Sequence, residues 1–248
     1  MNRLKRLRGR AVALAVTLAA VGAPTRVLHP AAAPRAVDRS DTRLTERDVA
    51  ASNEKIRMAY ADLAGMWRTR FAELGARFAV PRVVRYRGVT RSACGVMQPN
   101  NAAYCPRENT IYYDEVFVAA QAKAAALQLG TDGDMAGIGV IAHEMGHAAA
   151  IQLGYSSPVV YENESVADCL AGAFARHADE NGSLEPGDVD EAFFGMAAAA
   201  DPTPELTGNR RIDRRILTRA ALLGHGTREQ RMENFRVGLD GGTRACLA

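Results

Sequence analysis

Two histidines and a glutamate stand close together in the segment His143-Glu144-Met145-Gly146-His147, which has the form H-E-x-x-H. On a helix, residues four apart lie on one face, with Cβ atoms about 5–6 Å apart. His143 and His147 could therefore bind one metal ion as neutral nitrogen ligands. Glu144 would lie near enough to accept a proton from a metal-activated water. The spacing predicts a zinc site, and the alternative is a histidine pair that only makes hydrogen bonds in the core.

The segment lies in a helix that we predict over Asp134–Gln152. Asp132-Gly133 precede this helix as candidate N-cap residues, and Gly154 follows as a C-terminal glycine. Outside the motif the helix is apolar almost all round, which is typical of a buried helix. Buried polar groups need partners, because an unpaired one costs roughly 2–7 kcal/mol in an apolar environment. A metal ion would satisfy both histidines at once.

A catalytic zinc usually has three protein ligands and one open position. His29 lies in the N-terminal segment and is excluded, while His177 and His225 remain together with several carboxylates. We favour Glu164 as the third ligand, with Glu162 as its rival.

Glu164 and Asp168 are four residues apart and so share a helical face. Metal-bound histidines normally donate their second ring N–H to a carboxylate, and Asp168 suits that supporting role. The alternative is that both are surface acids of an amphipathic helix.

The two motifs resemble those of the neutral zinc metallopeptidases of bacteria. That family combines H-E-x-G-H with a second motif close to E-L-Q-A-D-C-x-A-G, and here the second motif is ESVADCLAG at 164–172. Further segments agree in the same order: TRSACG at 90–95, YCP at 104–106, IYYD at 111–114 and HGTREQR at 225–231. The resemblance covers about Ala51 to the C-terminus.

The chain departs from the family pattern at two places. Ala148 stands where the family often has a further histidine, and Ser165-Val166 replace Leu-Gln. Neither departure affects a proposed ligand. The resemblance implies a zincin-like fold, an α+β domain that is mainly helical, with a small sheet packed on two active-site helices.

As a hypothesis, one Zn²⁺ is bound by His143, His147 and Glu164, with Glu144 as the catalytic base for peptide hydrolysis. A further donor could stabilise the oxyanion. His225 or Tyr112 could supply that donor, although His225 could also have only a structural role in a turn.

Composition sets broad limits on the class of protein. The chain has 248 residues and is 48% hydrophobic, which is enough for one catalytic domain with a sizeable core. Its formal net charge is +3. Residues 1–36 hold seven of the basic residues and no acidic residue, which leaves 24 basic and 28 acidic residues, a net charge of −4. This mildly acidic remainder gives no electrostatic case for nucleic-acid binding; the expected partner is a peptide or protein substrate.

The N-terminus has the form of an export signal. A basic stretch, Met1–Arg10, precedes the 13-residue apolar stretch Ala11–Ala23. We predict a signal peptide over 1–23, with cleavage there or as late as residue 36, a disordered linker over 24–43 and a zinc metallopeptidase domain over 44–248. The alternative is an uncleaved membrane anchor. Both interpretations place the domain outside the cytoplasm.

Four cysteines are consistent with that compartment, because an even number in an exported protein suggests disulfides. Three pairings are possible. We favour Cys94–Cys105, which closes a short loop, and Cys169–Cys246, which ties a helix to the C-terminus. Zinc binding by cysteine is the competing idea, but the chain has no C-x-x-C spacing.

The remaining pattern is mostly helical. A helix is predicted from Thr45, with an apolar stripe that suits core packing and ends before Pro81. Strands are predicted at Arg82–Arg87 and Asn109–Val118. Further helices are expected at Ala119–Leu129, Val160–Asp179, Asp188–Ala200 and Asn209–Leu223, and from a capping box at Thr227 to about Leu239.

These observations favour an exported zinc-dependent metalloendopeptidase. Two alternatives remain open at this point: an exported zinc-binding protein without turnover, and a membrane-tethered processing protease.

Overall fold

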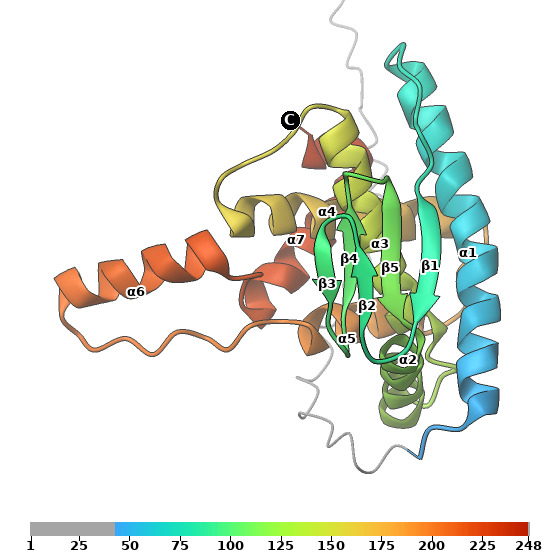
Figure 1. The fold of residues 1–248 in the computed structure, drawn as a ribbon, viewed down its shortest axis with the longest axis horizontal. Helices are drawn as coiled ribbons and strands as arrows, with labels where there is room; N and C mark the ends of the chain where they lie inside the picture. Colours follow the sequence, from blue (N-terminus) through green and yellow to red (C-terminus); the bar gives the residue numbers. More distant parts are fainter. Residues whose placement is uncertain (1–42, 248) are drawn as a thin grey trace, which may run out of the picture. The chain divides into compact units, whose positions relative to one another are not determined.

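The computed structural model describes residues 43–247, which form seven helices and five short strands (Figure 1). The predicted signal peptide and all but the last residue of the predicted linker lie outside the described residues. In chain order the elements are α1 (Glu46–Glu73), β1 (Arg82–Tyr86), β2 (Thr90–Ser92), β3 (Gly95–Met97), β4 (Ala102–Cys105), β5 (Thr110–Asp114), α2 (Glu115–Leu129), α3 (Asp134–Gln152), α4 (Val160–Glu180), α5 (Asp188–Ala198), α6 (Arg210–Leu223) and α7 (Arg228–Cys246). The mainly helical α+β class expected from the sequence is confirmed.

The strands form two small sheets. In the larger one the order is β1-β5-β4, with β1 parallel and β4 antiparallel to the central β5. β2 and β3 form a separate antiparallel hairpin. Because side chains alternate along a strand, Ile111 and Tyr113 of β5 face the helices, whereas Tyr112 packs with Tyr86 and Met97 on the other face.

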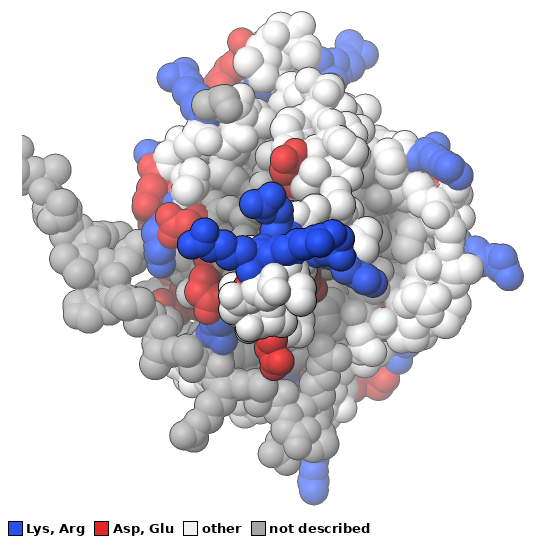
Figure 2. Space-filling model, turned by 90° about the vertical axis from the view of Figure 1, so that its left-hand side faces the viewer, with Lys and Arg blue, Asp and Glu red and all other residues white. Residues whose placement is uncertain are grey.

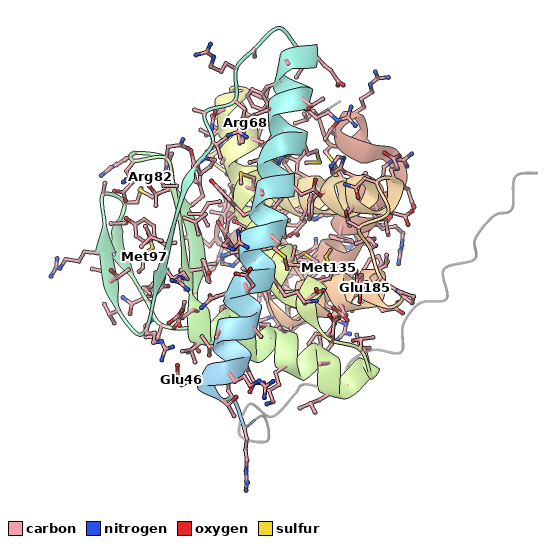
Figure 3. All side chains as sticks on the ribbon, turned by 90° about the vertical axis from the view of Figure 1, so that its right-hand side faces the viewer. Glu46, Arg68, Arg82, Met97, Met135 and Glu185 are labelled. Carbon is pink, nitrogen blue, oxygen red and sulfur yellow. A yellow bond between two sulfur atoms is a disulfide. The ribbon has the colours of Figure 1, made fainter. Side chains whose placement is uncertain are left out.

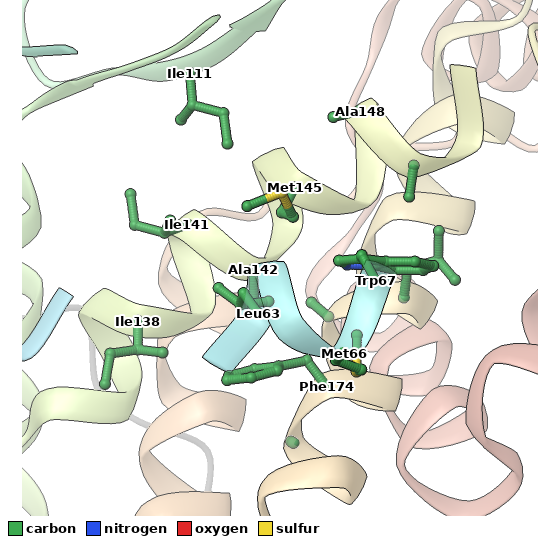
Figure 4. Close-up of a cluster of buried hydrophobic side chains, with 14 of the residues drawn as sticks. Leu63, Met66, Trp67, Ile111, Ile138, Ile141, Ala142, Met145, Ala148 and Phe174 are labelled. Atoms are coloured by element: carbon green, nitrogen blue, oxygen red, sulfur yellow. The ribbon is translucent and has the colours of Figure 1, made fainter. Parts of the chain in front are cut away.

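Helix α3 lies at the centre of the helical layer and contacts α1, α2, α4, α5 and both β4 and β5. Its apolar circumference explains this position, because every side of the helix needs a packing partner. Figure 4 shows Ile138, Ile141 and Met145 of α3 among side chains of neighbouring helices, which include Leu63, Met66 and Trp67 of α1 and Phe174 of α4.

The long helix α1 covers one side of α3. It begins at a capping box in which Thr45 and Asp48 each bond the other's backbone N–H. Most of its predicted apolar stripe is buried, with Leu63, Trp67 and Phe71 almost fully inaccessible, whereas Leu74 at its end is exposed. Figure 3 looks onto α1, with the strands to one side of it and most of the other helices behind it or to its other side.

Close contacts between helices fix the position of α4. A Cβ at Gly146 would lie 2.9 Å from the backbone oxygen of Ala167, and one at Gly238 of α7 would lie 1.7 Å from that of Cys169. Both glycines therefore allow α3 and α7 to pack closer to α4 than a side chain would permit.

Disulfides join Cys94 to Cys105 and Cys169 to Cys246, the same pairs that the sequence favoured.

Several boundaries differ from those predicted. The strand expected over Asn109–Val118 ends at Asp114, because the Asp114 side chain accepts a hydrogen bond from the Val116 N–H and starts α2 early. Helix α7 continues past Leu239 to Cys246, with non-helical backbone at Gly242. The short strands β2, β3 and β4 were not predicted.

The N-terminus of α3 is capped by a distant residue and not by the local acids. Gly133 occupies the N-cap position and offers no side chain. Instead, the buried carboxylate of Glu191 in α5 accepts hydrogen bonds from the backbone N–H groups of Gly133 and Met135, both at 2.9 Å. This contact fixes the helix that carries the H-E-x-x-H motif against α5.

Candidate metal centre and cleft

Helix α3 brings the two motif histidines together at one point. His143 and His147 lie one turn apart, and their Nε2 atoms are 3.1 Å apart. His143 is buried, whereas His147 is partly accessible. The two imidazoles therefore present their outer nitrogens to the same small volume.

Glu164 of α4 completes the group. One carboxylate oxygen lies 3.1 Å from Nε2 of His143 and the other lies 3.4 Å from Nε2 of His147. Zinc ligand bonds of about 2.0–2.2 Å in a tetrahedron place the ligand atoms about 3.3–3.6 Å from one another. The convergence of two imidazole nitrogens and a carboxylate at nearly this separation fits a zinc ion.

The charge balance of the group also favours a cation. Burial lowers the pKa of His143, but hydrogen bonds with Asp168 and Glu164 outweigh it and raise the pKa to about 10. Burial raises the pKa of Glu164, but hydrogen bonds with His143 and His147 outweigh this effect and hold the pKa well below its usual value of 4.5. A proton or a metal ion is therefore stabilised at this point, and a metal would compete with the proton.

Asp168 lies behind His143, as the sequence predicted. Its Oδ1 accepts a hydrogen bond from Nδ1 of His143 at 2.8 Å, and the residue is fully buried. A proton on Nδ1 leaves Nε2 free to bind a metal, so this contact selects the tautomer that a ligand needs.

Arg231 of α7 is a component that the sequence analysis did not assign. Its buried guanidinium donates from Nε and from a terminal nitrogen to the two oxygens of Asp168, at 3.0 and 2.6 Å. It also donates to the backbone oxygen of Ala199 at 2.9 Å. Arg231 is the last residue of the HGTREQR segment, the final segment that resembles the family, and this position could have indicated a role at the site.

Glu144 is buried beside the histidines and faces the same cleft. One of its carboxylate oxygens accepts a hydrogen bond from the backbone N–H of Tyr104 in β4, at 2.7 Å. A backbone donor carries no side-chain signature, so this contact could not be read from the sequence. It joins the helix of the motif to the edge of the sheet.

The cleft in front of these residues has a volume of about 660 Å³. β4, α2, α3, α4, the end of α5, the segment before α7 and the first turn of α7 form its walls. The four motif residues His143, Glu144, His147 and Glu164 all line it, as do Tyr104, Tyr155 and His225. The candidate metal-binding group thus opens onto this cleft.

The remaining candidates from the sequence, two possible oxyanion donors and two alternative ligands, do not all lie at the cleft. His225 lies at the cleft, where its backbone N–H donates to Asp201 at 2.5 Å. Tyr112, the other oxyanion donor suggested from the sequence, does not line the cleft: it lies on the far face of the sheet, and its hydroxyl donates to Glu108 at 2.9 Å. The rival Glu162 is exposed and accepts from Ser157, and His177 contacts Asp62.

Comparison with known proteins agrees with this arrangement. Residues 7–247 match the family described as "Putative neutral zinc metallopeptidase". The chain belongs to this family. It is similar to the proteins named "Uncharacterized protein YpfJ" of Escherichia coli strain K12 and of strain O6:H1 CFT073, each 33% identical over 195 residues. The matched region is 72% of this chain and 64% of each relative, so the chain spans less than two thirds of their length. No solved structure matches the chain significantly.

Two further observations concern the compartment. Both disulfides favour an oxidising environment outside the cytoplasm. Within residues 43–247, none of the helices has the length and apolar character needed to span a membrane.

Proposed function

We propose that this chain is an exported zinc-dependent endopeptidase. One observation carries the proposal: His143, His147 and Glu164 converge on one point, and Glu144 faces the same cleft. A structural zinc site has no need of a carboxylate that is not a ligand. A hydrolytic site needs one as a base.

His143, His147 and Glu164 would hold the zinc ion, and Asp168 would fix the tautomer of His143. When bound, the zinc supplies Lewis acidity that lowers the pKa of water in the site to about 7 and polarises a peptide carbonyl. The nearly complete burial of His143 and Asp168 keeps these groups in one orientation.

Glu144 acts as the proton carrier. The Tyr104 N–H holds one of its oxygens, which leaves the other to accept a proton from the attacking water. Glu144 then gives this proton to the nitrogen of the leaving amine as the C–N bond breaks. His225 lies at the cleft with its side chain more than half exposed, where it can donate to the developing oxyanion.

The edge of the sheet is suited to an extended peptide. Asn101 turns its backbone oxygen toward β5, where it accepts from the Asp114 N–H at 2.9 Å. In an antiparallel pair the next residue faces the other way, so Ala102 directs its N–H and C=O away from β5. Ala102 lines the cleft, and a substrate strand could pair with this edge.

The decisive experiment compares wild type with Glu144→Gln and His143→Ala by metal analysis and by cleavage of a peptide library. We expect zinc in wild type and in Glu144→Gln, with cleavage only in wild type. His143→Ala should lose both zinc and cleavage. Zinc without cleavage in wild type would point to the zinc-binding protein without turnover, and equal cleavage by Glu144→Gln would exclude the mechanism.

Export is tested separately, by locating the protein in cell fractions and in the medium. A protein released into the medium would agree with the proposal, whereas one retained in the membrane fraction by its N-terminal segment would indicate the membrane-tethered processing protease.

A further inference from the structure

The chain between Pro202 and Gly224 leaves the body of the described residues as an arm that carries α6 (Figure 1). Its base is fixed at Asp201, whose N–H donates to Gly226 O at 2.9 Å and whose carboxylate accepts from the His225 N–H at 2.5 Å. None of the residues of α6 is fully buried. The helix also contacts α4, so it is held near the cleft but is not part of the core.

One side of α6 is strongly basic. Five of its fourteen residues are arginines, and all are exposed: Arg210, Arg211, Arg214, Arg215 and Arg219. None of these five takes part in an ion pair with another residue in the range 43–247. The one acid of the helix, Asp213, accepts from Thr207 instead. Figure 2 shows the resulting blue patch at the front of the molecule.

Large apolar side chains accompany the arginines and are also exposed. Their accessible fractions range from 41% to 65%, and they are Ile212, Leu217, Leu222 and Leu223. Five residues of the two kinds line one shallow hollow: Arg214, Arg215, Arg219, Leu222 and Leu223. A helix that exposes arginines beside leucines and isoleucines has the composition of one that lies in a membrane interface.

We propose that α6 docks on an anionic phospholipid surface. The five arginines have no acidic partner among residues 43–247 and complement lipid phosphates, and the leucines beside them can enter the acyl boundary. Nucleic acid would complement the arginines but would leave the leucines exposed to water. Contact between the α6 helices of two copies is disfavoured by charge, because both helices are basic. Docking by the arm would hold the cleft near the membrane surface, since His225 follows α6 after a single glycine.

A fluorophore on α6 tests the contact between this helix and a phospholipid surface in the full chain. The label reports on α6 itself, so membrane binding by the N-terminal segment alone would not produce the signal. The four cysteines are all in disulfides, so Thr218→Cys adds one thiol that an environment-sensitive dye can label selectively. Thr218 lines the same hollow as the arginines. Thr69→Cys on the exposed side of α1 is the matched control.

We expect the dye at Thr218 to shift to the blue with phosphatidylglycerol vesicles but not with phosphatidylcholine vesicles, and the dye at Thr69 to stay unchanged. Exchange of Arg214, Arg215 and Arg219 for Ser should weaken vesicle binding roughly 100-fold, because each arginine near an anionic surface contributes about fivefold. Exchange of the same three residues for Lys should retain most of the binding, and added salt should weaken it.

Three results would overturn the proposal. The first is no shift at Thr218 with anionic vesicles. The second is a shift at Thr218 with duplex DNA that equals or exceeds the shift with vesicles. The third is a shift that depends on protein concentration in the absence of lipid, which would indicate contact between copies of this chain.

Discussion

The guanidinium of Arg231 and the carboxylate of Asp168 form a two-point contact in the interior, with N–O distances of 3.0 and 2.6 Å. The same carboxylate accepts from Nδ1 of His143 at 2.8 Å. A side chain of α7 therefore sets the orientation of a proposed ligand on α3 through a residue of α4. Arg231 is a positioning residue in this arrangement, because its guanidinium contacts Asp168 and Nδ1 of His143, the latter at 3.3 Å, and is not one of the three groups that converge on the candidate metal site.

Exchange of Arg231 for Met should weaken zinc binding by about 10–100-fold, because Asp168 would no longer be held in place. It should also lower the free energy of unfolding by about 3–5 kcal/mol, since the buried Asp168 carboxylate loses its ionic partner. Zinc affinity is measured by competition with a chelator at several pH values, and stability by urea unfolding.

Two controls separate these effects. Arg231→Lys should recover part of the zinc affinity, and Arg244→Met, on the exposed side of the same helix, should change neither quantity by much. If Arg231→Met kept the zinc affinity of wild type and its pH dependence while losing stability, Arg231 would be only a packing residue.

Gly146 is predicted to control the distance between the two motif helices. A Cβ there would lie 2.9 Å from the Ala167 backbone oxygen, so Gly146→Ala should push α4 away from α3 and carry Glu164 with it. We expect a loss of about 1–3 kcal/mol in unfolding free energy together with weaker zinc binding.

Gly139 provides the matched control for this prediction, because it lies in the same helix and has only the flexible end of Met196 nearby, at 3.7 Å. Gly139→Ala should be neutral or stabilising by up to about 1 kcal/mol, from helix propensity. Equal behaviour of the two variants would contradict the role given to Gly146.

The sequence predicted the parts of the site that depend on spacing within one helix. The positions of His143 and His147, and of Glu164 and Asp168, follow from four-residue spacing alone, because a helix fixes which side chains share a face. The contacts between helices were harder to foresee. Glu191 caps α3 from 56 residues away, and Arg231 contacts Asp168 from another helix. Contacts between residues so far apart in the chain produce no short sequence pattern that would predict them.

Tyr112 illustrates a different difficulty. All five residues of β5 are buried, so the strand has no alternation of apolar and polar residues to indicate which face meets the helices. The tyrosines at 112 and 113 were therefore equivalent in the sequence. In the structure Tyr113 faces the helical core and Tyr112 faces the opposite side.

Asp188 should make the protein less stable as the pH rises. Burial raises its pKa from 3.8 to about 6, with further contributions from Asp134 and Glu191. The folded state therefore binds more protons than the unfolded state between these values. The contribution of Asp188 to stability is present below about pH 4, falls as the pH passes through 6 and is lost above it.

Asp188→Asn removes this titration and keeps an oxygen that can accept from the Glu185 N–H. We expect the variant to be more stable than wild type by about 1 kcal/mol above pH 7, after allowance for solvent screening, and to lose this advantage toward pH 4. Thermal unfolding across this pH range measures the difference. Asp190→Asn, an exposed change of the same charge two residues away, is the matched control, and a flat difference between wild type and Asp188→Asn across the pH range would contradict the assignment.

The two disulfides should contribute unequally to stability. They span 77 and 11 residues of sequence, and the chain-entropy model assigns them about 4.5 and about 3 kcal/mol respectively. Cys169 also neighbours Asp168 and lies where α7 packs closely on α4, so exchange of Cys169 and Cys246 for Ser should loosen the support of His143. We expect this double variant to lose more stability, and more zinc affinity, than the variant without Cys94 and Cys105. Urea unfolding and chelator competition measure both losses, and the reverse order would show that the short loop near β4 constrains the site more than the contact between α4 and α7 does.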